Sequence, residues 1–130
     1  MGIAVRDLRA AAKLYSLLGL AISGIEEIAH EGVRVAMLPA GESRIELLEP
    51  TRPDSPVGHF LDRRGEGLHH VALTVEDLGA AVARLRAAGA RLVKDEIQTG
   101  AGGHRYVFLH PSTAGGVLIE LVEKENEAKA

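Results

Sequence analysis

The feature that most constrains this chain is an internal duplication at two levels. The segment "VRDLRAAAKLYSLLGL" begins at Val5, and "VEDLGAAVARLRAAGA" begins at Val75, 70 residues later (75 − 5). Further along each half, "IELLE" at 45–49 recurs as "IELVE" at 119–123, 74 residues later (119 − 45). A sequence repeated at nearly constant spacing predicts two copies of one supersecondary unit, which bury equivalent faces.

The first repeated segment predicts a helix in each half. Asp7 and Asp77 stand where a side-chain carboxylate can accept the first free N–H groups of a helix. Gly19 and Gly89 suit the left-handed residue that follows a helix C-terminus. Between them, apolar residues recur at the i, i+3, i+4 and i+7 spacing of one helix face. These stripes comprise Leu8, Ala11, Ala12, Tyr15 and Leu18 in the first half, and Leu78, Ala81, Val82 and Leu85 in the second.

The second repeated segment predicts a strand that carries a carboxylate. Strand side chains alternate between faces, so Ile45 and Leu47 share one face and Glu46 lies on the other. An ionised carboxylate that is buried without a partner is strongly destabilising. A single such residue is more often a solvated edge residue. Because Glu46 recurs as Glu120, we interpret both as paired side chains that point into a common site.

Each half therefore has the predicted order strand, helix and three strands. We expect an α+β fold in which two tandem βαβββ modules form a curved, barrel-like sheet around a metal cleft, with the helices outside. Glu46 and Glu120 should face this cleft from equivalent positions, and Ile45 and Leu47 should face a helix. The modules are expected at about 1–50 and 68–123, with a linker at 51–67 that holds a helical piece over 57–64, and a charged tail at 124–130.

Composition narrows the function classes. The chain has 130 residues, which suits one domain, and no cysteine, so a metal would need oxygen and imidazole ligands. Its formal net charge is −3 and it has no basic block, which argues against nucleic-acid binding. No run of 18 apolar residues predicts a transmembrane helix, and no secretory signal is visible at the N-terminus. We therefore expect a cytoplasmic protein with no membrane partner.

Four segments together resemble the methylmalonyl-CoA epimerase family of the vicinal oxygen chelate superfamily, which also includes glyoxalase I and the extradiol dioxygenases. The resemblance covers nearly the whole chain and implies a single vicinal oxygen chelate domain over 1–130. It implies an isomerase that interconverts the (R) and (S) epimers of methylmalonyl-CoA, works as a homodimer and serves propionate breakdown. The segments are "GIAVRDL", "IELLEPTRPDSPVGHFL", "GEGLHHVALTVEDL" and "GAGGHRYVFLHPSTAGGVLIELVE".

The resemblance also implies the site residues. By position, the family's metal ligands fall on Glu46 (a Gln in some members), His70 and Glu120, and a fourth ligand, a histidine, falls one position before Met1. Some members carry a proton-transferring glutamate at the position of Val35. The expected cofactor is a divalent metal ion, with Co²⁺ first and Zn²⁺, Mn²⁺ or Ni²⁺ as alternatives.

The implied chemistry is two-base proton transfer through an enolate. Epimerisation removes a proton from one face of a carbon and returns one to the other, so Glu46 and Glu120 are the candidate catalytic carboxylates. A cation chelated by two substrate oxygens would stabilise the enolate. Two alternatives stay open: a glyoxalase I-like lactoylglutathione lyase, and a metal-free binding protein of the same superfamily. Two inward carboxylates without a cation would repel each other, which argues against the last.

Other polar residues are assigned plainer roles. We expect His69 to be a packing residue that faces away from His70, and Glu49 and Glu123 to be solvated charges at strand ends. The turn at 112–116 is either a backbone cradle for substrate or the turn into the last strand. Residues with equally open or surface readings are His30, His59, Arg63, Arg64, His104, Arg105 and His110.

Overall fold

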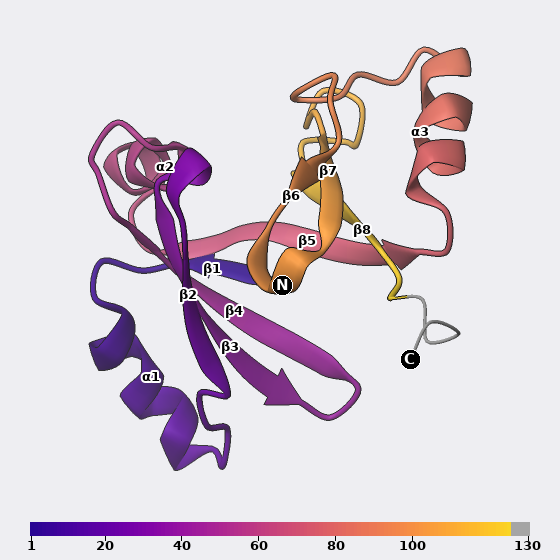
Figure 1. The fold of residues 1–130 in the computed structure, drawn as a ribbon. Helices are drawn as coiled ribbons and strands as arrows, with labels where there is room; N and C mark the ends of the chain where they lie inside the picture. The colour runs from indigo at the N-terminus through magenta and orange to yellow at the C-terminus, as the bar shows by residue number, and fades with distance from the viewer. Residues whose placement is uncertain (126–130) are drawn as a thin grey trace. The chain divides into compact units, whose positions relative to one another are not determined.

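The β-α-β-β-β order predicted for each half is present twice in the computed structural model, which describes residues 1–125 (Figure 1). Contacts divide the chain into two compact units, Met1–His69 and a second unit that starts at His70. The part of the predicted charged tail at 126–130 lies outside the described residues. Within residues 1–125, no helix has the length and hydropathy required to cross a membrane.

The first unit builds a four-stranded sheet with the strand order β2-β3-β4-β1. β1 runs parallel to β4, and the other neighbours are antiparallel. A helix in the predicted linker, α2, also belongs to this unit, and Ser55 caps it by accepting the N–H of Gly58. The elements are β1 (Gly2–Ala4), α1 (Leu8–Leu17), β2 (Gly24–Ile28), the 3-10 turn η1 (Ala29–Glu31), β3 (Val33–Ala40), β4 (Ser43–Pro50) and α2 (Pro56–Arg64).

The second unit repeats this topology in the order β5-β8-β7-β6, with β5 parallel to β8. Both predicted helix starts are confirmed, because Asp7 accepts the N–H of Ala10 and Asp77 accepts that of Ala80. The elements are β5 (Gly67–Val75), which begins just before the unit boundary, α3 (Leu78–Ala87), β6 (Gln98–Thr99), the 3-10 turn η2 (Ala101–Gly103), β7 (Arg105–Leu109) and β8 (Ile119–Glu123).

Strand register confirms that the two halves are equivalent residue by residue. Gly2 on β1 lies opposite Glu46 on β4, and Ala72 on β5 lies opposite Glu120 on β8. The members of these two pairs are again 70 and 74 residues apart (72 − 2 and 120 − 46). Glu46 and Glu120 therefore occupy the same position in their respective modules, as the duplication predicts.

Each helix covers the sheet face on which the duplication places it. In the first unit, Leu47 is buried with Leu8 of α1, and Ile45 packs against the same cluster. In the second unit, Leu121 is buried with Leu78 of α3. The prediction that Ile45 and Leu47 face a helix is therefore confirmed. These side chains anchor β4 and β8 from one side and leave the opposite face for Glu46 and Glu120.

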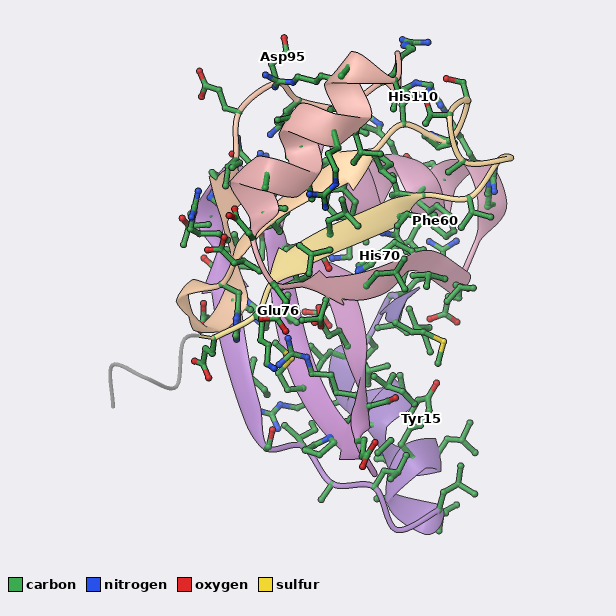
Figure 2. All side chains as sticks on the ribbon, turned by 90° about the vertical axis from the view of Figure 1, so that its right-hand side faces the viewer. Tyr15, Phe60, His70, Glu76, Asp95 and His110 are labelled. Atoms are coloured by element: carbon green, nitrogen blue, oxygen red, sulfur yellow. The ribbon has the colours of Figure 1, made fainter. Side chains whose placement is uncertain are left out.

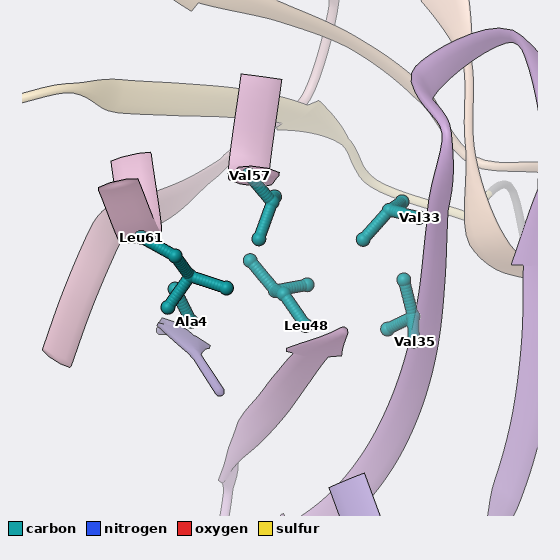
Figure 3. Packing of buried hydrophobic residues seen from close by; sticks show 6 residues of the cluster. All are labelled: Ala4, Val33, Val35, Leu48, Val57 and Leu61. Carbon is teal, nitrogen blue, oxygen red and sulfur yellow. The ribbon is translucent and has the colours of Figure 1, made fainter. Parts of the chain in front are cut away.

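The opposite face of β4 is partly covered by α2, which the duplication does not provide for (Figure 3). Val57 and Leu61 of α2 pack with Leu48, and a satellite cluster forms on the same face as Glu46. Gly58 makes this approach possible, since a Cβ atom there would lie 2.4 Å from the carbonyl oxygen of Pro53. The cluster consists of Ala4, Val33, Val35, Leu48, Val57 and Leu61.

We predict that Gly58→Ala destabilises the protein by about 2 kcal/mol or more, because the added methyl group meets backbone that cannot move aside. The matched control is Gly79→Ala in α3, where the nearest atom to a Cβ is 3.6 Å away and helix propensity favours alanine. Urea unfolding midpoints measure both. Equal midpoints for the two variants would contradict the tight packing of α2 on its loop.

Candidate metal and acid–base site

His70 and Glu120 meet in the second unit on the sheet face opposite α3. His70 lies on β5 and Glu120 on the neighbouring parallel strand β8 (Figure 2 labels His70). Nε2 of His70 is 3.4 Å from Oε1 of Glu120. The side chains are only 5% and 14% exposed, so the pair is largely removed from water. A separation of 3.4 Å is an ion-pair distance, longer than a charge-assisted hydrogen bond.

Two aromatic rings line the same face beside this pair. The Phe108 ring lies edge-on to His70 with centroids 5.3 Å apart, and Tyr106 lies edge-on to Phe108 at 5.6 Å. Phe108 is also the cross-strand neighbour of Glu120. Sequence reasoning missed both rings. Their two-residue alternation with Val107 and Leu109 was the available signal, because it places them on the face opposite the α3 core.

Glu46 has a different partner from Glu120. Its carboxylate is 15% exposed, and Oε1 lies 3.6 Å from Nε of Arg44, two residues earlier on the same strand face. The prediction that this strand carboxylate needs a partner is therefore met by an arginine that sequence reasoning did not single out. A guanidinium at this distance stabilises the ionised form of Glu46.

The position of Val35 holds only hydrocarbon. Val35 pairs with Leu48 across β3 and β4, and it is 2% exposed within the cluster that α2 covers. In the second unit the equivalent position holds Tyr106, which pairs with Val122. No proton-transferring side chain stands at Val35, so acid–base chemistry in this chain has to come from other residues.

The donor atoms of His70 and Glu120 suit a divalent cation. Two donor atoms each about 2.1 Å from a tetrahedral ion lie about 3.4 Å apart, which is the separation of Nε2 and Oε1. Within residues 1–125, no group of three or more His, Cys, Asp or Glu side chains gathers as a metal site. The structure thus brings together two of the three predicted ligands. Glu46 belongs to the other unit, and its part in a shared site stays a prediction.

Two plainer assignments are confirmed. His69 is a packing residue, because its ring lies edge-on to Phe60 of α2 with centroids 5.1 Å apart. The segment after β7 is a turn: Nδ1 of His110 accepts the N–H of Ser112 at 3.1 Å, and Gly116 donates to the carbonyl of Pro111. His30 and His59 lie at the surface, as expected.

The interpretation of Glu49 and Glu123 as solvated strand-end charges is wrong. Glu49 accepts the backbone N–H of Leu8 at 2.8 Å and binds Arg34 at 2.6 Å. Glu123 binds Leu78 and Arg105 in the same way. These side chains point to the helix face of their strands, where the helix start supplies unsatisfied N–H groups.

Comparison with known proteins identifies the family. A sequence profile of the glyoxalase/bleomycin resistance protein/dioxygenase superfamily matches residues 1–108. The ethylmalonyl-CoA/methylmalonyl-CoA epimerase of Cereibacter sphaeroides is 40% identical over 93% of this chain and 92% of its own. The methylmalonyl-CoA epimerase of Mycobacterium tuberculosis superposes with a TM-score of 0.91 at 41% identity, covering 99% of this chain and 89% of that one.

A third similar protein carries a ligand. A methylmalonyl-CoA epimerase in complex with methylmalonyl-CoA and ammonium superposes with a TM-score of 0.90 at 41% identity, covering 95% of this chain and 90% of the other. The predicted α+β class with two tandem βαβββ modules is confirmed by these superpositions. The chain therefore belongs to the glyoxalase/bleomycin resistance protein/dioxygenase superfamily and, within it, to the methylmalonyl-CoA epimerase family.

Proposed function

We propose that this protein is a methylmalonyl-CoA epimerase, with Glu120 and Glu46 as its proton-transferring carboxylates. The observation that carries the proposal is the His70–Glu120 pair, which is held on a sheltered, aromatic-lined face in a chain about 40% identical to named epimerases. An α-proton flanked by a thioester and a carboxylate is acidic enough for a carboxylate base to remove when the resulting enolate is stabilised.

The reaction needs one proton removed and one returned on the opposite face. In the proposed cycle, one carboxylate takes the C2 proton, the electron pair moves onto the thioester oxygen as an enolate, and the other group protonates C2 from the far side. Glu120 suits one role because the neighbouring rings of Phe108 and Tyr106 limit water around it, which strengthens its interactions with charge. Arg44 keeps Glu46 ionised and thus ready to accept a proton.

The proposal includes a divalent cation, with Co²⁺ as the first expectation, held by His70 and Glu120 together with Glu46. When bound, such an ion supplies positive charge to the enolate oxygen. His70 contributes a neutral imidazole nitrogen, and burial at 5% exposure favours that neutral form. The proposal further includes a homodimer that acts on methylmalonyl-CoA in propionate breakdown in the cytoplasm.

Glu120→Gln is expected to lower the epimerisation rate by about 10²- to 10⁴-fold, because an amide cannot accept the C2 proton. The rate is measured as solvent deuterium entering C2 of methylmalonyl-CoA. The matched control is Glu76→Gln in the same unit, where the carboxylate is 83% exposed and paired only with Lys124 among the ion pairs of the described residues. A loss of the same size in both variants would remove Glu120 from the mechanism.

Glu46→Gln separates the roles of ligand and base. The amide oxygen remains a metal ligand, so we expect bound metal per chain to stay unchanged while deuterium exchange falls by about 10²-fold or more. Metal content is measured by elemental analysis of the dialysed protein. Near-normal turnover in both Glu46→Gln and Glu120→Gln would mean that the acid–base pair lies elsewhere.

Removal of metal by a chelator is expected to abolish epimerisation, and added Co²⁺ is expected to restore it. His70→Ala should bind the ion more weakly, because it removes the only nitrogen ligand of the proposed set. Full activity in metal-free protein would exclude the cation from the proposal. Conversion of a glutathione hemithioacetal without any exchange at C2 of methylmalonyl-CoA would favour the lactoylglutathione lyase alternative.

A further inference from the structure

A three-part contact, here called the strand clamp, occurs once in each unit. In the first unit, Glu49 at the end of β4 joins Arg34 of β3 to the first residue of α1, Leu8. In the second unit, Glu123 at the end of β8 joins Arg105 of β7 to the first residue of α3, Leu78.

The two clamps agree atom by atom. Oε2 of Glu49 accepts the Leu8 N–H at 2.8 Å, and Oε2 of Glu123 accepts the Leu78 N–H at 3.0 Å. The other oxygen, Oε1, receives Nη1 of an arginine in each case, at 2.6 Å from Arg34 and 2.9 Å from Arg105. Both carboxylates are largely covered, with side chains 20% and 24% exposed, so these contacts are screened less than ordinary surface ion pairs.

The clamps are separate from the helix caps. Asp7 and Asp77 already accept the N–H groups of Ala10 and Ala80, and they belong to the same chain segments as the helices. Glu49 comes from a different strand, 41 residues away from Leu8 along the chain. A clamp therefore adds a tie between helix and sheet, in addition to the satisfaction of another N–H group at the helix start.

The clamped strand is the one that carries the proposed site carboxylate. Arg34 and Glu49 are direct cross-strand neighbours, so the clamp fixes β4 against β3. α1 follows β1, which pairs with the other edge of β4, so the same carboxylate fixes β4 against β1. Glu46 lies three residues before Glu49, about 10 Å along the strand and on its opposite face. Glu120 has the same relation to Glu123.

We propose that Glu49 and Glu123 are positioning residues, which hold β4 and β8 in register with both neighbours and thereby fix Glu46 and Glu120 in place. This inference rests on the proposed function for its activity readout. The clamp itself is a property of each unit alone.

The test compares clamp variants with cap variants. Glu49→Ala and Glu123→Ala remove a clamp, whereas Asp7→Ala and Asp77→Ala remove a cap from the same helix and leave the strand contact in place. All four should lower the urea unfolding midpoint. Only the clamp variants should accelerate amide hydrogen exchange in the strand ladder by about tenfold or more, which is the size expected for the loss of a charge-assisted hydrogen bond. The reporter amides are Val5 and Glu46 in the first unit, and Val71 and Lys124 in the second.

Activity and conservative variants complete the test. Clamp variants should lose about tenfold in kcat with little change in KM, because the carboxylates are displaced and binding surfaces are not. Glu49→Gln, which keeps an oxygen for the Leu8 N–H, should recover part of both effects. Equal ladder exchange in clamp and cap variants would overturn the inference, whatever the activity. If the wild-type protein showed no epimerase activity, the proposed function would fail, and ladder exchange would still decide the clamp.

A charge swap gives a second decision. In Arg34→Glu/Glu49→Arg the ion pair is restored, but a cation replaces the anion at the helix start, where the helix dipole disfavours it. We expect no recovery of ladder exchange in this double variant. Full recovery would show that the cross-strand ion pair alone matters and would overturn the helix-to-strand tie.

Discussion

The fold depends on one constraint: the last strand of each module has to serve two faces with opposite requirements. On one face of β4 and β8, apolar side chains anchor α1 and α3, as Leu47 and Leu121 show. On the other face the same strands present Glu46 and Glu120. The two-residue period of a strand makes both possible within five residues. A slip of one residue would bury the carboxylates under the helices and expose the leucines, so register is strongly specified.

Within this shared frame the two halves have diverged in chemistry. Glu120 meets an imidazole and two aromatic rings, whereas Glu46 meets a guanidinium and a face that α2 partly covers. A duplicated backbone thus provides two equivalent carboxylates with different surroundings. An epimerase requires this kind of asymmetry, because its two proton-transfer groups approach opposite faces of one carbon and alternate in protonation state.

The sequence predicted what depends on local pattern. The helix starts at Asp7 and Asp77, the βαβββ order and the equivalence of Glu46 with Glu120 all follow from periodicity and repetition. The misassigned residues depend on contacts between distant segments. Glu49 looks like a solvated strand end until α1 is folded back onto β4, 41 residues away. Arg44 was overlooked because a charged residue before an apolar strand usually faces solvent.

The two aromatic rings on the Glu120 face have a spectroscopic consequence. The chain has no tryptophan and only two tyrosines, Tyr15 on α1 and Tyr106 beside Phe108. Tyr106 is 5% exposed in a rigid stack that continues to His70. Its phenol absorption and emission therefore report directly on the polarity and charge of that face, against the background of a single distant phenol on α1. The protein contains its own optical probe, without any label attached near the carboxylate.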